Sequence, residues 1–154
     1  MAEHTICLLI KLGQVAFRLA EDGIGGTGLR VRHYSVLQAL ADNGAMPQLA
    51  LGSFLRIDPA TMVTTLDDLE RTGYAERKRD PQDRRRYAVD ITAEGRKVLA
   101  DLNRTLVGLD GEVLADLGAT ERDSLHALLG SLAGSPTLTS LFDAAREQNG
   151  ARRA

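Results

Sequence analysis

Basic side chains gather in one short stretch of this sequence. Between Arg71 and Arg86, seven basic residues stand against three acidic ones, a local charge of +4. The whole chain has a net charge of −2, so its remainder carries −6. Clustered guanidinium and ammonium groups pair with phosphates, which makes a polyanion such as a nucleic acid the predicted partner of this stretch. Its basic members are Arg71, Arg77, Lys78, Arg79, Arg84, Arg85 and Arg86.

A stripe of short polar side chains lies just before this basic stretch. Asp58 and Pro59 predict the start of a helix over residues 59–72, because aspartate caps free N–H groups and proline is favoured in the first turn. The positions expected to face the core are Met62, Val63, Leu66 and Leu69. Small polar groups on the opposite side are of a type that reaches base edges in the major groove. The candidates are Pro59, Ala60, Thr61, Thr64, Thr65 and Asp68.

Other chemistries have little support in the sequence. The single cysteine, Cys7, excludes an intramolecular disulfide, and His4, His33 and His126 are too far apart in sequence to form a local metal site. No nucleophile–base pair, phosphate-binding loop or paired carboxylate motif is recognisable, so no catalytic residue, metal or cofactor is predicted. Cys7 is expected to be a small buried hydrophobe, with a role as a redox sensor as the alternative.

Hydrophobic periodicity predicts a mainly α-helical (α+β) fold. Helices are expected over residues 5–22, 31–41, 47–55, 59–72 and 93–117, followed by a helix after Thr120 and a short last helix. After Gly73 the period changes, and residues 74–79 and 86–91 are expected to pair as a two-stranded hairpin around the turn DPQDRR. Two short helices followed by a basic hairpin are typical of a helix-turn-helix with a wing.

The pattern divides the chain into regions of different purpose. Residues 31–99 are the expected winged helix-turn-helix domain, and residues 93–117 form a long connecting helix. Residues 1–30 and 117–149 are expected to form a helical dimerisation region, and residues 150–154 a disordered tail. The terminal helices carry more apolar side chains than one small domain buries, which predicts a homodimer. The positions that carry this prediction are Ile6, Leu9, Leu128, Leu132, Leu138 and Phe142.

No export signal or membrane span is expected. The first residues, MAEHTICLLIKLGQ, have no basic leader and no small-residue cleavage site. No run approaches the roughly 18 apolar residues that a membrane-spanning helix needs. A cytoplasmic, nucleoid-associated location without a membrane partner is therefore predicted.

Residues 51–99, LGSFLRIDPATMVTTLDDLERTGYAERKRDPQDRRRYAVDITAEGRKVL, resemble the MarR family of transcription regulators. The most specific part of the resemblance is DPQDRRRYAVDITAEG. It implies that Arg85 at the wing tip enters a minor groove and that Asp83 steadies it. The family's Leu-Thr-x-x-Gly unit at the end of the wing corresponds to residues 91–95, Ile-Thr-Ala-Glu-Gly.

The recognition helix departs from the family pattern. Where the family commonly has an arginine after its Val-Thr pair, Val63 and Thr64 are followed here by Thr65. Asp67 and Asp68 come next. A carboxylate accepts a hydrogen bond from a cytosine amine but repels phosphates, so the sequence leaves the base contacts of this helix open.

The resemblance implies a sequence-specific regulator of double-stranded DNA, a repressor that binds a pseudo-palindromic operator as a homodimer. It also implies an aromatic or phenolic effector, for which Arg18, His33 and Tyr34 are the candidates. The alternatives are a redox-sensing regulator that uses Cys7 and a winged-helix module that binds protein. An enzyme is not expected. The predicted DNA contacts are Pro59, Ala60, Thr61, Thr64, Thr65, Asp68, Arg77, Lys78, Asp83, Arg84, Arg85 and Arg86.

Overall fold

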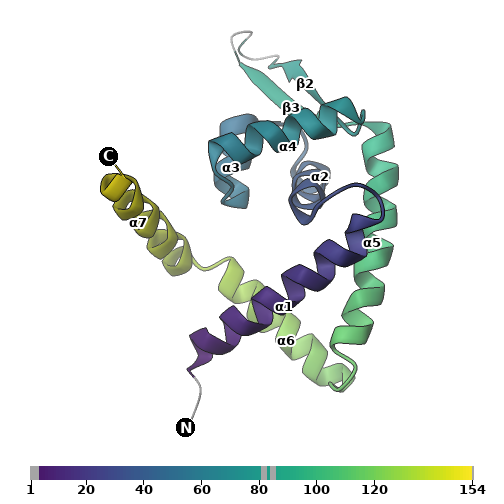
Figure 1. Cartoon of the computed structure of the whole chain (residues 1–154), viewed down its shortest axis with the longest axis vertical. Coiled ribbons are helices and arrows are strands. Elements are labelled where there is room, and N and C mark those ends of the chain that lie inside the picture. Colours follow the sequence, from purple (N-terminus) through teal and green to yellow (C-terminus); the bar gives the residue numbers. More distant parts are fainter. Residues whose placement is uncertain (1–3, 81–82, 84–85, 154) are drawn as a thin grey trace. The chain divides into compact units, whose positions relative to one another are not determined.

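The computed structural model describes residues 4–80, 83 and 86–153, with side chains as far as Gln148. The chain divides into two compact units, Met1–Asp110 and Gly111–Ala154, and each is described by itself. The elements in chain order (Figure 1) are α1 (Thr5–Gly25), α2 (Val31–Asn43), β1 (Met46–Pro47), α3 (Gln48–Leu55), α4 (Pro59–Arg71), β2 (Ala75–Arg79), β3 (Tyr87–Ile91), α5 (Ala93–Val113), α6 (Ala119–Ala133) and α7 (Pro136–Arg153). The predicted mainly α fold with a small β component is confirmed.

The core of the first unit lies among α2, α3, α4, the strands and the start of α5. Leucines from α2 and α4 are fully buried there, with Leu102 of α5 and Val89 of β3 beside them. The alternation of Val89 and Ile91 inward matches the period of two expected for a half-buried strand. Burial of these side chains positions α4 and the strands against each other. The buried leucines of α2 and α4 are Leu37, Leu40, Leu66 and Leu69.

The strands form one antiparallel sheet in the order β1-β3-β2. The predicted hairpin is present, and it pairs Arg77 with Val89 and Ala75 with Ile91. A third strand, β1, pairs Met46 with the other side of Val89 and was not predicted. β1 consists of only Met46 and Pro47, and two residues are too few to show the alternation that predicts a strand.

One junction fixes the wing to α4 and α5. Gly73 has φ +77°, a left-handed conformation that ends α4 and lets the Tyr74 N–H donate to the Leu69 carbonyl at 2.9 Å. The Thr92 hydroxyl donates to the Gly73 carbonyl at 2.7 Å and accepts from the Gly95 N–H at 3.0 Å. A Cβ on Gly95 would overlap the Tyr74 carbonyl oxygen. The Thr-x-x-Gly spacing therefore caps α5 and lets it approach the backbone that follows α4.

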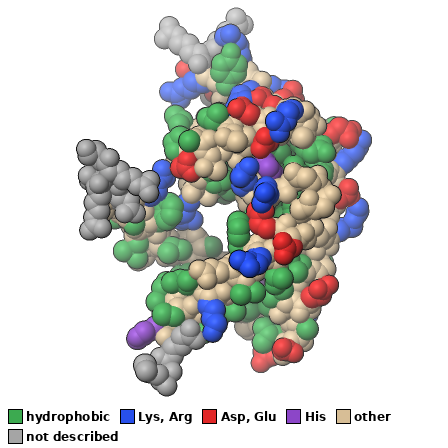
Figure 2. Space-filling model, viewed as in Figure 1, with side chains coloured by type: hydrophobic (Ala, Val, Ile, Leu, Met, Phe, Trp, Pro, Cys, Tyr) green, Lys and Arg blue, Asp and Glu red, His purple; other side chains and the backbone are tan. Residues whose placement is uncertain are grey.

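The terminal helices bury little within either unit. In α1 only Ile24 is buried, and the described residues of α6 and α7 include no buried side chain. Hydrophobic side chains consequently reach the surface on these helices (Figure 2). The most exposed are Ile6, Ile10, Leu12, Val15, Phe17, Leu128, Leu129 and Leu141.

Several helix ends differ from the predicted ones. α1 continues to Gly25 rather than residue 22, and α2 continues to Asn43 rather than residue 41. α5 ends at Val113 rather than residue 117, close to Gly111 and the boundary of the units. The backbone of α7 is helical as far as Arg153 and so includes most of the stretch for which a disordered tail was predicted. A polar tail lacks the apolar period used to place helices, which is why the pattern ended the last helix early.

Candidate nucleic-acid interface

The exposed side of α4 is not the side that the polar stripe predicted. Its outer face, defined here as Ala60, Val63, Thr64, Asp67 and Arg71, is exposed throughout. These positions are three or four residues apart, so they share one side of the helix, opposite buried Leu69. This side offers a methyl group, a valine, a hydroxyl, a carboxylate and a guanidinium to a partner.

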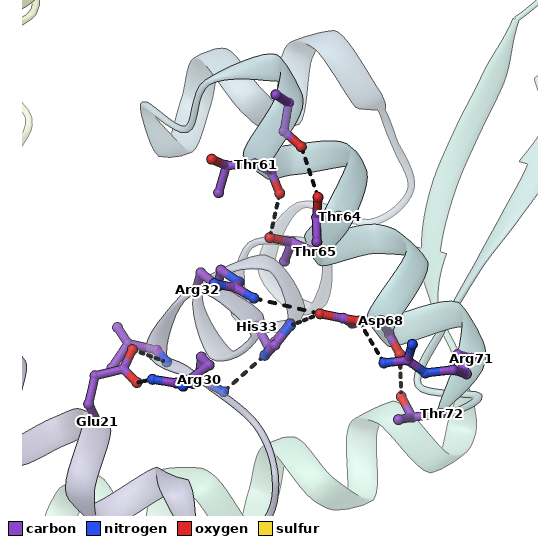
Figure 3. A network of polar contacts seen from close by, with 12 residues as sticks. Glu21, Arg30, Arg32, His33, Thr61, Thr64, Thr65, Asp68, Arg71 and Thr72 are labelled. Carbon is purple, nitrogen blue, oxygen red and sulfur yellow. Dashed lines mark hydrogen bonds and ion pairs between the residues drawn. The ribbon is translucent and has the colours of Figure 1, made fainter.

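Two residues of the recognition helix are placed wrongly by the sequence pattern. Thr65 was expected on the free face, but it is fully buried and its hydroxyl donates to the Thr61 carbonyl at 2.7 Å (Figure 3). Val63 was expected in the core, but it is exposed. Thr65 lies next to Leu66 and Leu69 around the helix, and this angular position outweighs its polarity because its hydroxyl is satisfied within the helix.

The start of α4 is capped as the sequence predicts. Asp58 accepts hydrogen bonds from the Thr61 backbone N–H at 2.9 Å and from the Thr61 hydroxyl at 2.6 Å. These bonds, the hydroxyl first, hold the pKa of Asp58 below its ordinary value. Thr61 therefore has its hydroxyl proton engaged, whereas Pro59 and Ala60 are exposed beside it. Thr64 is exposed as predicted, with its hydroxyl donating to the Ala60 carbonyl at 3.2 Å.

Asp68 is the centre of a network between α4 and α2 (Figure 3). Its Oδ1 accepts from Arg71 Nη2 at 2.6 Å. Its Oδ2 lies 3.2 Å from His33 Nε2 and 3.6 Å from Arg32 Nη2. Partial burial raises the pKa of Asp68, but the His33 hydrogen bond and the Arg71 charge outweigh it and the pKa is lowered. This carboxylate is thus occupied by the protein, which disfavours the predicted base contact.

His33 is buried and joins α2 to α4. Its Nδ1 accepts from the Arg30 backbone N–H at 2.9 Å, so the proton of the neutral ring is on Nε2, which then donates to Asp68. Burial lowers the pKa of His33, although Asp68 opposes this shift. Nearby, Glu21 of α1 accepts from the Val31 N–H at 3.0 Å and pairs with Arg30. His33 is therefore a structural link rather than an open ligand contact.

Arg77 faces the protein rather than the solvent. Its guanidinium bonds to Glu70 and lies 3.1 Å from Asp67 Oδ1, and its backbone N–H donates to Glu70 Oε1 at 2.9 Å. The Arg77 side chain is only 24% exposed, against 60% for Asp67. Arg77, which was predicted to contact a phosphate, instead forms ion pairs within the protein that link β2 to α4.

The remaining predicted cations lie along the wing. Lys78 is exposed and pairs with Glu76 at 2.7 Å, and this carboxylate raises the pKa of Lys78. Arg86 is exposed, and its Nε lies 3.5 Å from Asp83 Oδ2. Arg84 and Arg85 lie outside the described residues, so the pairing of Asp83 with Arg85 stays a prediction.

The effector candidates do not converge on one site. Arg18 borders an open surface hollow on α1 that is lined by Gln14, Phe17, Arg18 and Glu21. Tyr34 instead donates its hydroxyl to Asn103 Oδ1 of α5 at 3.0 Å. Burial raises the pKa of Tyr34, and the negative charge of Asp42 raises it further. Cys7, expected to be buried, is exposed on α1.

The described residues hold neither a metal-binding cluster nor a membrane span. No three or more histidine, cysteine, aspartate or glutamate side chains among them come together as a metal site. No helix in this part of the chain combines the length and apolarity needed to cross a bilayer.

Sequence reasoning left Arg32, Asp67 and Val63 out of the interface and counted Arg71 only as part of the basic stretch, not as a residue of the helix face. A signal for Arg71, Asp67 and Val63 on that face was present. Taking Leu69 as the centre of the buried side places Asp67, Arg71 and Val63 on the opposite half of the helix. Arg32 had no such signal, because its proximity to Asp68 joins positions far apart in the sequence.

The helix pair α3–α4 with the β2–β3 wing is a winged helix-turn-helix, the architecture of a DNA-binding regulator. The sequence profile of the MarR family matches residues 29–87. A putative transcriptional regulatory protein for the hcr operon of Thauera aromatica is 33% identical over 122 residues, which cover 78% of this chain and 74% of that protein.

Solved structures give the same result. A MarR-family regulator from Rhodococcus sp. RHA1 is similar with a TM-score of 0.75 and 27% identity, covering 82% of this chain and 91% of that one. CouR from Rhodococcus jostii RHA1, solved with p-coumaroyl-CoA, has a TM-score of 0.70 and 29% identity, covering 82% and 90%. The chain belongs to the MarR family and is a DNA-binding transcriptional regulator.

Proposed function

We propose that this regulator represses transcription by binding a pseudo-palindromic operator as a homodimer. The outer face of α4 lies in the major groove, and the wing follows the neighbouring phosphates and minor groove. The observation that carries the proposal is the exposure of Ala60, Val63 and Thr64 on α4, with Lys78 and Arg86 exposed on the adjacent wing. Methyl and hydroxyl groups suit base edges, and cations suit phosphates.

A second copy supplies the partner for the terminal helices. The exposed apolar side chains of α1, α6 and α7 are too many to leave in contact with water. Covering them with a symmetry-related copy places two α4 helices on one DNA duplex. The expected operator therefore has half-sites about one helical turn apart.

Binding to the DNA upstream of the chain's own gene tests this function. We expect retarded complexes in a gel-shift assay whose affinity falls steeply with salt, because each phosphate contact releases counterions. Arg85→Ala should cost about 1 to 3 kcal/mol per protomer if the wing tip reads the minor groove. A chain that binds no duplex at any salt concentration would instead be a protein-interaction module.

An effector site is proposed at the hollow on α1. Arg18 offers a guanidinium for a carboxylate and Phe17 an aromatic face, while Glu21 in the same hollow caps α2. An aromatic acid bound there would compete with Glu21 for cationic and N–H partners and so disturb the link to α2. CouR, which is similar in structure, was solved with an aromatic thioester, p-coumaroyl-CoA.

Linkage gives the test of this effector site. Aromatic acids and phenols are screened by thermal shift with and without operator DNA, and a true effector stabilises the free protein more than the complex. Arg18→Ala should abolish the shift produced by acids, whereas exposed Lys11→Ala on the same helix should leave it unchanged. Ligands that stabilise the free protein but leave DNA affinity unchanged would rule out regulation from this site.

A further inference from the structure

α4 takes part in two clusters of ion pairs, one around Arg77 and one around Asp68, and they expose charges of opposite sign to solvent. In the cluster at the base of the wing, Arg77 is 24% exposed and Asp67 60%, so the carboxylate is presented outward. Around Asp68 the order is reversed: the carboxylate is 24% exposed, Arg71 75% and Arg32 41%. The second cluster therefore presents positive charge although its centre is an aspartate.

We propose that Arg71 and Arg32 form a phosphate-binding site at the C-terminal end of the recognition helix, and that Asp68 is the positioning residue that holds both guanidinium groups. This rests on the proposed placement of α4 in the major groove. The ligand is the DNA backbone itself. No base contact is assigned to Asp68, Arg71 or Arg32.

The charge balance of the cluster favours an anion. Arg32 and Arg71 contribute two positive charges and Asp68 one negative charge, and the buried His33 is neutral in its Nε2-protonated form. Glu21 of α1 and Arg30, which directly precedes α2, pair with each other. A net charge of one positive unit thus remains on the exposed part of the cluster.

The donors of this cluster are only partly used. Arg71 gives Nη2 to Asp68, and a guanidinium carries five N–H donors, so others remain for a phosphate. The Arg32 contact to Asp68, at 3.6 Å, is an ion pair longer than a hydrogen bond. Arg32 Nε is buried and has no hydrogen-bond partner in the described part of the chain, so the ion pair of Nη2 with Asp68 is the interaction that orients this guanidinium.

Arg71 is placed along α4 where the helix would reach the edge of the major groove. Arg71 lies seven residues after Thr64 on the same outer face, about 10 Å further along the helix axis. The major groove is about 12 Å wide, and recognition helices contact base edges mainly through their N-terminal residues. A guanidinium this far from the reading end therefore meets the phosphates at the rim of the groove.

The chain contains a matched control for this geometry. Arg104 on α5 donates through the same atom, Nη2, to Asp101 Oδ1 three residues earlier, as Arg71 does to Asp68. The exposed fractions of the two arginine side chains are 77% and 75%. Arg104 lies outside α4 and the wing, so Arg104→Ala and Asp101→Asn reproduce the chemical changes without touching the proposed site.

Fluorescence anisotropy tests the proposal on two labelled duplexes, one from the DNA upstream of the chain's gene and one of random sequence and equal length. We expect Arg71→Ala and Arg32→Ala to weaken binding to both duplexes and to lower the salt slope by about 0.9 for each phosphate that is no longer neutralised. Arg71→Lys should retain most of that slope. Arg104→Ala should leave it unchanged.

Asp68→Asn separates positioning from simple repulsion. The substitution removes a negative charge, so a merely repelling Asp68 predicts tighter binding. Positioning predicts weaker binding, and predicts that the effect vanishes when Arg71 and Arg32 are already alanine. A loss of binding that persists in that background would show a structural role only and overturn the assignment to Asp68. The same holds if a thermal melt shows that Asp68→Asn is already partly unfolded at the temperature of the binding assay.

The remaining outcomes are also decisive. Equal salt slopes for Arg71→Ala and Arg104→Ala would overturn the phosphate site, and a loss confined to the upstream duplex would make Arg71 a base-reading residue instead. A wild-type chain that binds neither duplex would reject the proposed function rather than this inference alone.

Discussion

The DNA-binding region and the terminal helices bury their apolar side chains in different ways. In the first unit, α2, α4 and β3 place Leu40, Leu66 and Val89 at or near zero exposure. In α6, by contrast, Leu128 is 69% exposed, and the described side chains of that helix include no buried one. Both regions are helical and rich in leucine, so composition does not explain the difference.

This contrast shows which interactions stabilise each region. The DNA-binding region has partners for its apolar side chains within its own unit, and polar links such as Asp68–His33 join its helices. The terminal helices have periodic leucines without such partners. The first region should therefore respond to substitutions as a packed core does, and the second as an intermolecular interface does.

The largest expected effect is that of Gly95→Ala on the fold of the DNA-binding region. The added methyl group would overlap the Tyr74 carbonyl oxygen and press on Ile91 Cγ1, so α5 and the wing must separate. We expect a loss of about 3 kcal/mol in the free energy of unfolding, measured by urea denaturation. Gly108→Ala is the control, since a Cβ there meets nothing within 4 Å. Equal stability of the two variants would show that this junction is not tightly packed.

The next largest effect concerns the terminal helices. Leu128→Glu combined with Leu132→Glu places two charges on the apolar side of α6. We expect a monomer in analytical ultracentrifugation and a loss of operator affinity of more than about tenfold, because one chain reads one half-site. The thermal unfolding of the DNA-binding region should persist. Ser131→Glu, also exposed on α6, should remain dimeric, and a dimeric double variant would remove α6 from the interface.

A smaller effect is expected from pH, through His33. Its pKa in the folded chain lies below the ordinary 6.5, chiefly because of burial, so the unfolded chain binds more protons below pH 6.5. The free energy of unfolding should therefore be constant above that value and fall as the pH drops through the window beneath it. His33→Gln should flatten this dependence in thermal melts, and exposed His126→Gln should not. Stability that rises on acidification would contradict the neutral, Nε2-protonated ring.

The smallest predicted effect is that of Thr64→Ala on sequence preference. Thr64 is uncharged and exposed on the outer face, so its loss should change the ranking of operator variants by about 1 kcal/mol. Binding to random DNA should be unaffected, because no phosphate contact is removed. A uniform loss on every duplex, measured by anisotropy, would place Thr64 against the backbone rather than a base.

The sequence by itself determined the helices, the hairpin and the family. Helix starts such as Asp58–Pro59, the end at Gly73 and the alternation before Ile91 are local signals, because capping, turns and periodicity depend on neighbours in the chain. Residues 51–99, and above all the segment DPQDRRRYAVDITAEG, carry the resemblance to the MarR family. These features needed no knowledge of packing.

Only the tertiary structure decided what the polar side chains do. Thr65 is buried and Val63 exposed because packing selects a side of α4 by angle, not by polarity. Arg77 faces inward because Asp67 and Glu70, close only after the wing folds back on α4, neutralise it. The interactions of Asp68 with α2 cross some 35 positions of sequence, so periodicity, which reads only neighbouring residues, carries no signal for them.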